Sequence, residues 1–542
     1  MTEVTTRPPL SVPPADLWTP VRRPVGHPSR PPSAARDAAL VGAMVVLATV
    51  LRLPTLARAY WVDEGISVGI ASHHVSQIPG LLRHDGSPPL FYVILHFWLR
   101  AFGATQVSTH IMSLLISLAV VPVAWWCAGR LFGRRVALWA ALLAATSPFL
   151  NWYATESRMY PLVVGLAMVA VTCSVAAVLY DSRRDFAGAV VAFVALLYTH
   201  NWSLYLFGVT VVVLLGWAAA RRDRRLAGWV AAGAGLVLAA YAPWVPSLVS
   251  QVLHTAAPWA IPPSVGDLFA DPSSVLGGTL GVLVVPMFAA GALVAWVYRP
   301  SRANRITALL ATIGLATLLA GWLIAQVKPS WTSRYLAVAL GPLLLALAGC
   351  LGGCWLGRRI VAVAVAMLVA WSVVGSLLPD PNARDAKSNV AAIAAAAGPQ
   401  LNPGDLVIVT QSEQVAVLAH YLPAGLHYVT PTGPVPDPRV VDWRDLVQRL
   451  QRSNPCVTVA PAIAALPPGS HVLVVNPYRH LGASGTTWAR TVNAQVGAVN
   501  QLILRDPGVG ELQSYWEATE PKPYSAVDAA LFVRTASPAA CS

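Results

Sequence analysis

The chain has 542 residues, of which 56% are hydrophobic and only 11% are charged. Ordinary soluble domains carry about twice that share of charged residues, so the composition excludes a typical soluble enzyme and indicates a membrane protein. The net charge of +13 could serve nucleic-acid binding, but the arginines flank apolar runs. The arginines are explained better by membrane topology and by attraction to anionic lipid than by nucleic-acid binding. No nucleic-acid partner is therefore expected.

Residues 1–36 are rich in proline and arginine and lack an apolar period, which predicts a disordered cytoplasmic tail. The next run, 38–56, starts too late for a normal signal peptide and is expected to remain as a membrane span. The apolar run 88–103 is short and begins with two prolines. If it crossed the membrane, the arginines that follow the next span would lie outside. We therefore expect an interfacial helix within an outer loop, 57–105.

Ten further apolar runs alternate between arginine-rich loops and loops that carry acidic, histidine or aromatic residues. The predicted spans are 106–129, 136–153, 161–180, 186–201, 203–220, 226–246, 274–297, 306–326, 335–356 and 360–378. Short loops rich in arginine stay cytoplasmic, so the N-terminus is expected inside and the polar loops outside. The sequence thus predicts a mostly α-helical, multi-pass protein of the cell membrane with about eleven spans in residues 37–378.

The composition changes after Pro379, where strand-like runs alternate with helical stretches. This pattern predicts a small α/β domain, 379–542, on the extracytoplasmic side. Cys456 and Cys541 are the two cysteines outside the apolar spans. Disulfides persist outside the cell, so we expect these two residues to be bonded to each other.

Asp63 and Glu64 follow the first span. Adjacent residues cannot both point into one pocket, so we expect Asp63 to face a site and Glu64 to brace it. A helix cap is the alternative role for this pair. Asp85 precedes a Pro-Pro turn and could bring a second carboxyl group near the first. A polar surface turn is the alternative for Asp85.

The next outer loops add cations and aromatic residues. Glu156 and Arg158 lie between two spans, just before Tyr160. An arginine there suits bidentate phosphate binding, whereas an interfacial aromatic belt is the alternative for the segment. His200 ends an outward span, where a lone histidine is more often a structural hydrogen-bonding residue. Arg334 breaks the charge rule, which favours a functional role over a headgroup anchor.

No metal-ligand spacing is evident in the sequence, and no cofactor is identified, with a divalent cation left open. In their order and sidedness, the outer segments resemble the GT-C superfamily of integral membrane glycosyltransferases. They are most similar to bacterial protein O-mannosyltransferases and the lipid A aminoarabinose transferase. The resemblance covers about residues 38–378 and rests on Asp63-Glu64, Pro88-Pro89-Leu90, Tyr153, Glu156, Arg158, Tyr160, His200 and Arg334-Tyr335. Many relatives carry an acidic or histidine residue directly before the Pro-Pro turn, where this chain has Ser87.

The resemblance implies a polyprenyl-phosphate sugar donor and a glycan, lipid or protein acceptor outside the membrane. Asp63 would be the general base, with Glu64 beside it, and direct displacement would invert the anomeric centre. The remaining residues expected to bind the donor phosphate or sugar are Arg158, Arg334, Glu156, Tyr160, His200, Asp85 and Tyr335. The O-mannosyltransferase likeness and an alanine-rich composition of actinobacterial type favour mannose, with arabinose second.

Three rival functions are weighed against this one. A transporter or flippase would place polar groups near the bilayer midplane, whereas this chain has almost no ionisable residue inside a predicted span. A receptor with an outer sensor domain would not need carboxylates and arginines converging on one face. A hydrolase that uses two carboxylates would share that site, and transfer to a glycan rather than to water would distinguish it.

Overall fold

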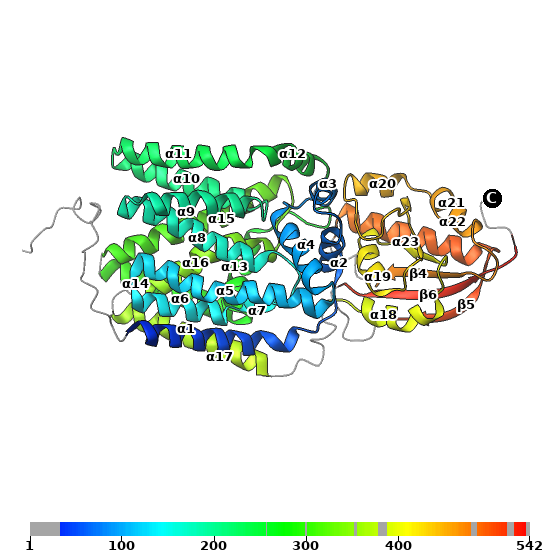
Figure 1. Ribbon diagram of the computed structural model, residues 1–542, viewed down its shortest axis with the longest axis horizontal. Helices are drawn as coiled ribbons and strands as arrows, with labels where there is room; N and C mark the ends of the chain where they lie inside the picture. Colours follow the sequence, from blue (N-terminus) through cyan, green and yellow to red (C-terminus); the bar gives the residue numbers. More distant parts are fainter. Residues whose placement is uncertain are drawn as a thin grey trace, which may run out of the picture.

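The computed structural model describes residues 33–255, 257–298, 301–351, 355–377, 387–478, 485–517 and 525–537. Most of the predicted N-terminal tail, together with Cys354 and Cys541, lies outside these ranges. Within them the chain is mostly helical: long helices fill one end of an elongated molecule and a mixed sheet fills the other (Figure 1).

Each predicted span contains a helix of the bundle. These helices are α1 (Ser33–Arg52), α5 (Gln106–Phe132), α6 (Arg134–Thr146), α8 (Tyr160–Tyr180), α9 (Arg183–Leu197), α10 (Ser203–Ala220), α11 (Arg224–Tyr241), α14 (Gly281–Tyr298), α15 (Arg302–Val327), α16 (Ala337–Cys350) and α17 (Trp355–Leu377). Helix α1 begins at Ser33, so its first turn lies within residues that were predicted to belong to the disordered tail, 1–36. Among the described residues, seven helical stretches are long and apolar enough to cross a membrane. The chain is therefore a multi-pass membrane protein, and the count of about eleven spans stays a prediction.

Two of the predicted spans are each divided between two helices, one before a proline and the other at a glycine. The run 136–153 is divided at Ser147, where Pro148 opens the separate helix α7 (Pro148–Tyr153). Proline is well placed at the first turn of a helix, whereas inside a helix it removes a backbone hydrogen bond and kinks or breaks it. The run 274–297 is divided at Gly278, whose φ of 58° ends α13 (Val265–Gly277) before α14 begins.

Short helices form a layer between the bundle and the sheet. They are α2 (Val62–Ala71), α3 (Ile78–Asp85), α4 (Leu90–Phe102) and α12 (Val245–His254), and the first three appear at the junction in Figure 1. Helix α4 forms in the run predicted as an interfacial helix, and it packs against α2 and α5. Two 3-10 turns, η1 (Leu53–Thr55) and η4 (Ser333–Leu336), belong to the same layer.

The C-terminal segment forms the predicted α/β domain. Its strands are β1 (Leu406–Val409), β2 (His427–Thr430), β3 (Gly433–Pro434), β4 (His471–Pro477), β5 (Val509–Trp516) and β6 (Val527–Arg534), in the order β3-β2-β1-β4-β6-β5. Strand β1 runs parallel to β2 and β4, while the other pairs are antiparallel. The helices are α18 (Val390–Ala397), α19 (Val415–Tyr421), α20 (Leu446–Arg452), α21 (Pro455–Thr458), α22 (Ala460–Ala464) and α23 (Thr487–Arg505).

Alternate residues of β1 join two different cores. Leu406 and Ile408 pack in a cluster with residues of α23, whereas Val407 and Val409 pack in the cluster that includes α18 and α19. This division follows from the two-residue period of a strand, whose successive side chains point to opposite faces. The second cluster is continuous with the core of the bundle, so the domain and the bundle share one apolar interior.

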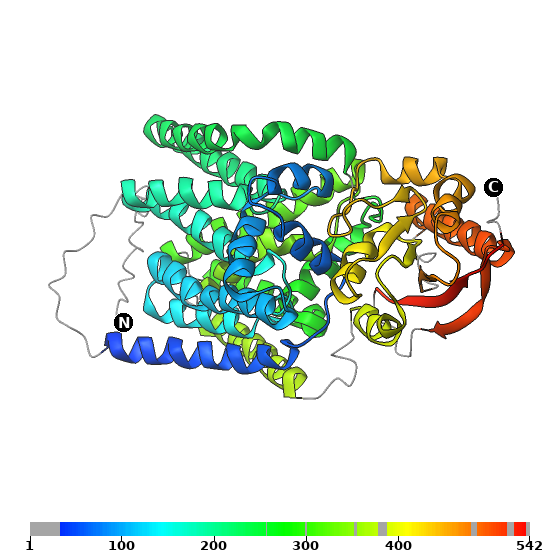
Figure 2. The same ribbon diagram turned by 45° about the vertical axis from the view of Figure 1, so that its right-hand side comes forward.

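The domain docks on α2, and two glycines of α2 permit the close approach. A Cβ atom at Gly65 would lie 2.7 Å from the Cα of Val417 in α19, and one at Gly69 would overlap the carbonyl oxygen of Arg439. One turn further on, His73 Nε2 lies 2.6 Å from Asp437 Oδ2. In the turned view the short blue helices again lie on the side of the bundle that faces the C-terminal domain (Figure 2).

Candidate active site

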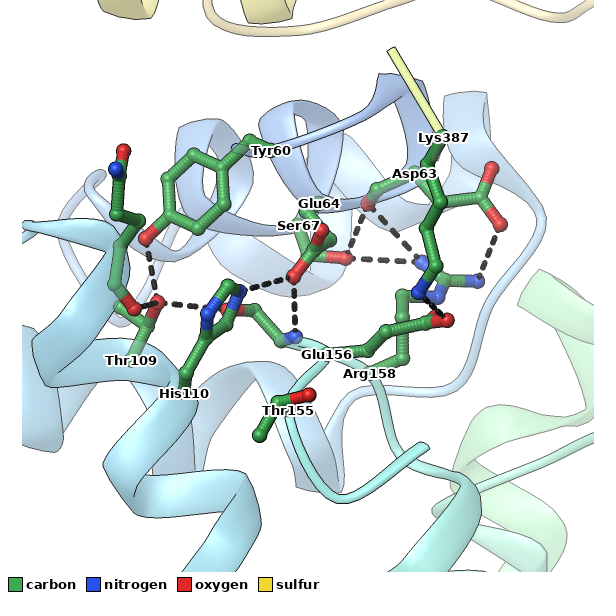
Figure 3. A network of polar contacts seen from close by, with 12 residues as sticks. Tyr60, Asp63, Glu64, Ser67, Thr109, His110, Thr155, Glu156, Arg158 and Lys387 are labelled. Atoms are coloured by element: carbon green, nitrogen blue, oxygen red, sulfur yellow. Dashed lines mark hydrogen bonds and ion pairs between the residues drawn. The ribbon is translucent and has the colours of Figure 1, made fainter. Parts of the chain in front are cut away.

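Helix α2 directs its two acidic residues to different neighbours. Successive helical residues point about 100° apart, so adjacent carboxylates diverge. Asp63 Oδ2 lies 3.9 Å from Arg158 Nη2 and 3.7 Å from Arg334 Nη1. Glu64 turns the other way, and its Oε1 accepts a hydrogen bond of 2.7 Å from the backbone N–H of Ser157 (Figure 3).

Glu64 is held in a fully buried polar contact. The Nε2 atom of His110 lies 2.7 Å from Glu64 Oε1, and Nδ1 lies 2.8 Å from the carbonyl oxygen of Leu56. A carbonyl only accepts, so Nδ1 carries a proton and fixes the ring orientation. Burial acts to raise the pKa of Glu64, but His110, Lys387 and the Ser157 N–H together hold it below its usual range. The contacts from His110 and Ser157 both reach Oε1 of Glu64, and the bond from Ser157 ties this carboxylate to the loop that carries Arg158.

Arg158 connects three parts of the outer layer. Its Nη1 donates to Ser67 Oγ at 2.9 Å and to the Tyr92 hydroxyl at 3.4 Å. The Tyr92 hydroxyl in turn donates to Asp85 Oδ2 at 3.2 Å. Burial raises the pKa of Asp85, which the Arg158 charge partly offsets. The Pro-Pro turn therefore brings Asp85 to the same site as Asp63, although no direct bond joins the two carboxyl groups.

Arg334 comes from η4 and lies among aromatic rings. Its guanidinium carbon is 5.6 Å from the ring centroid of Trp61, 4.9 Å from that of Trp259 and 5.7 Å from that of Tyr335. Such distances are typical of cation–π contacts, which hold an arginine in place without using its hydrogen-bond donors. The rings therefore hold Arg334 in place, and the N–H groups of its guanidinium can donate hydrogen bonds to a ligand.

His200 and two tyrosines complete the site. The ring of His200 lies 4.9 Å from that of Tyr335 and 6.2 Å from that of Tyr160, between centroids. The backbone N–H of Trp202 donates to His200 Nδ1 at 3.2 Å, so a neutral ring carries its proton on Nε2. Tyr160 itself is fully buried beneath the other groups.

A cavity of about 320 Å³ brings most of the predicted residues together. Its walls include Asp63, Asp85, Arg158, His200, Arg334 and Tyr335. Three buried polar atoms of these wall residues have no hydrogen-bond partner among the described residues: Asp63 Oδ2, Arg158 Nε and Arg334 Nε. Buried polar groups are normally satisfied, so these atoms indicate a site built for a polar ligand. Glu64 and Glu156 lie behind this wall.

Glu156 makes an ion pair that the sequence did not reveal. It is 1% exposed and pairs with the ammonium of Lys387, which is 7% exposed and comes from the C-terminal segment. Burial raises the pKa of Glu156, and the Lys387 charge opposes this. The expected role of Glu156 in binding the donor phosphate or sugar stays a prediction, since one carboxylate oxygen pairs with Lys387 and the other has no hydrogen-bond partner among the described residues.

His110, the partner of Glu64, was not selected from the sequence either. It lies within the predicted span 106–129, and the predicted spans were expected to hold almost no ionisable residue. A histidine inside an apolar run was the available signal, because such residues usually have a polar partner. Among the described residues, no group of three or more His, Cys, Asp or Glu side chains could hold a metal ion. Cys541 is outside the described ranges, so its bond to Cys456 stays a prediction.

Comparison with known proteins identifies related folds. Residues 86–246 match the family model of dolichyl-phosphate-mannose-protein mannosyltransferases. No curated protein sequence matches the chain. The Archaeoglobus fulgidus oligosaccharyltransferase in its apo form is similar in structure, with a TM-score of 0.52, 11% identity and coverage of 90% of this chain and 75% of that chain.

Two further solved structures are similar over much of the chain. AglB from the same archaeon, solved with an inhibitory peptide and a dolichol-phosphate, has a TM-score of 0.51 and 10% identity, and the match covers 73% of this chain and 64% of that chain. ArnT from Cupriavidus metallidurans has a TM-score of 0.44 and 15% identity, with coverage of 92% and 98%. The family match and the shared fold confirm that the chain is similar to the O-mannosyltransferase-like members of the GT-C glycosyltransferases.

Proposed function

We propose that this chain is an inverting glycosyltransferase that moves a sugar from a polyprenyl-phosphate donor to an acceptor outside the cytoplasm. Asp63 is the general base: it takes the proton of the acceptor hydroxyl as that oxygen attacks the anomeric carbon. The bond from this carbon to the phosphate oxygen breaks, and polyprenyl phosphate leaves. Arg158 and Arg334 hold that phosphate and balance the charge it gains.

One observation carries the proposal: the Asp63 carboxylate lies between the buried Arg158 and the partly buried Arg334 on the wall of a cavity. The separations of 3.7 and 3.9 Å are longer than those of close ion pairs, so the three groups are near one another without satisfying one another. The unpartnered Nε atoms of both arginines leave donors for a phosphate. A base and two cations around one space match the needs of a displacement whose leaving group is a phosphate.

The apolar part of the cavity suits the prenyl chain. Leu248 and Ile324 line it beyond the arginines, together with Trp202. Helices α12 and α15 supply the first two, so a lipid tail can stay in contact with apolar surface while its phosphate reaches Arg334. AglB, which has a similar fold, was solved with a dolichol-phosphate.

The topology forms part of the proposal. We place the N-terminus inside, eleven spans in residues 37–378 and the domain 379–542 outside, with Asp63 at the outer surface. Mannose is the favoured sugar and arabinose the second, because the matched family uses dolichyl-phosphate-mannose. The acceptor is a cell-wall glycan, a lipoglycan or a protein of the envelope.

A direct assay tests the proposal. The purified protein is incubated with polyprenyl-phosphate-mannose or polyprenyl-phosphate-arabinose and an envelope glycan fraction, and labelled products are separated. Transfer to the glycan supports the proposal, and release of free sugar alone would indicate a hydrolase. A transporter or flippase is the alternative function: it would move the lipid-linked sugar across a vesicle membrane and form no new glycosidic bond. A glycan profile of a deletion strain identifies the acceptor.

A further inference from the structure

Lys387 joins the C-terminal domain to the outer loops of the bundle. Its backbone belongs to the domain: the carbonyl oxygen accepts a 2.7 Å hydrogen bond from the Ser525 N–H. Two residues later, the Asn389 side chain bonds both the N–H and the carbonyl of Val527 in β6, each at 2.8 Å. These bonds to Ser525 and β6 fix the chain at Lys387 and just after it, while the lysine side chain turns toward the bundle.

The lysine side chain ends inside the charged cluster of the site. Its ammonium pairs with Glu156 Oε1, and its Nζ lies 4.9 Å from the ring centroid of Trp152. Figure 3 shows Lys387 entering beside Asp63, with Arg158 next to it. Both partners of the pair are buried, so loss of one would leave an uncompensated charge in the interior.

Glu156 is linked directly to the residues that surround Asp63. The backbone N–H of Arg158 donates to the carbonyl of Glu156 at 2.7 Å, and the intervening Ser157 N–H donates to Glu64. The position of Glu156 therefore sets the conformation of the loop that presents Arg158. The other Glu156 oxygen, Oε2, is buried without a hydrogen-bond partner among the described residues, so the lysine is the main restraint on this carboxylate.

We propose that Lys387 is a positioning residue of the transfer reaction, supplied by the C-terminal domain: its ion pair with Glu156 fixes the loop that holds Arg158 in place for the donor phosphate. This inference rests on the proposed function. It gives the domain a role in the reaction: when β6 and Lys387 dock, the active site gains the cation that offsets its excess of buried carboxylates.

The charges around Glu156 determine the direction of the pH effect. Asp63 and Glu64 face it from α2, Tyr153 from α7 and Arg158 from its own loop. Burial and the two α2 carboxylates raise the pKa of Glu156, and Lys387 lowers it. Without the lysine the pKa rises further, so Glu156 gains a proton at a higher pH. The low-pH limb of kcat/KM should therefore move to higher pH, and activity should recover as the pH increases.

Four variants test this role with the full-length protein in nanodiscs and a polyprenyl-phosphate-sugar donor. Lys387→Met should lower kcat by about 10²-fold, as expected when a catalytic group is displaced by about 1 Å, and should shift the low-pH limb upward. Lys387→Arg keeps the charge and should retain most of the activity. Arg444→Met is the matched control, because it removes an exposed cation of the same domain that pairs with Asp442 on the surface.

The double variant Lys387→Met with Glu156→Gln separates function from folding. It removes both buried charges, so its melting temperature should return toward that of the wild type while turnover stays low. Recovery of both stability and turnover would overturn the proposal and leave the pair as a structural contact. An unshifted pH profile in Lys387→Met would also overturn it. The wild-type protein is measured first in this series. If it transfers no sugar, that result contradicts the proposed function rather than the role of Lys387.

Discussion

Neutralising Asp63 should separate catalysis from donor binding. Asp63→Asn keeps the volume and removes the base, and loss of a general base typically lowers the rate about 10²–10⁴-fold. That range corresponds to an increase of about 3–5 kcal/mol in the activation free energy of the transfer step. The same change removes a carboxylate that lies 3.7 and 3.9 Å from two arginines. At these separations each attraction is about 4 kcal/mol for an effective dielectric constant of about 20.

This electrostatic change has the opposite effect on the donor phosphate. In the native site the phosphate shares Arg158 and Arg334 with Asp63, and in the variant it has both cations to itself. We therefore expect kcat to fall by two to four orders of magnitude while the KM for the donor stays constant or decreases. A substitution that merely disrupted the site would weaken donor binding as well.

The assay measures initial rates over a range of polyprenyl-phosphate-sugar concentrations, with melting temperatures to establish folding. Asp267→Asn is the control, because Asp267 caps α13 away from the cavity and an asparagine oxygen can accept the same backbone bond. A folded Asp63→Asn protein with more than about a tenth of the wild-type kcat would refute the assignment of Asp63 as the base. A low kcat together with a raised donor KM would refute the electrostatic argument.

Three further predictions concern the phosphate site, the topology and the C-terminal domain. Arg334→Lys keeps the charge but loses the fork geometry and the ring contacts, so the donor KM should rise about tenfold. If the variant is saturated by the same donor concentrations as the wild type, Arg334 is only an anchor to lipid headgroups. A reporter that fluoresces only in the cytoplasm should stay dark when fused to Ser542, and a bright fusion would contradict the outward placement of the domain. Mass spectrometry of non-reduced protein should find one peptide pair linked through Cys456 and Cys541; two free thiols would contradict both the bond and this placement.

The predicted sidedness of the loops was the basis for choosing the site residues, whose roles stay predictions. Asp63, Arg158 and Arg334 were selected because they occur in polar outer loops, and the structure brings them to one cavity wall. Lys387 could not be found in this way, since its pairing with Glu156 depends on how a separate domain docks. His110 was missed because it lies inside an apolar run, whereas the site residues were sought in the polar loops.

The limits of the fold prediction have local causes. Hydropathy located every helix of the bundle, since a span needs a long apolar stretch whatever its neighbours are. It could not locate the breaks at Pro148 and Gly278, where backbone conformation rather than polarity ends a helix. The sheet order was also beyond reach, because strand pairing depends on contacts between distant segments.

The triplet Asp63-Glu64-Gly65 shows why the helical form of this short segment matters. In a strand, Asp63 and Gly65 would share a face, and only Glu64 would point away. In helix α2 the three residues point about 100° apart, so they reach three different partners. Asp63 faces the arginines of the cavity, Glu64 faces His110 of the bundle, and Gly65 lies against Val417 of the C-terminal domain. Rotation of α2 would break all three contacts together, so the bundle and the domain jointly fix the direction of the proposed catalytic carboxylate.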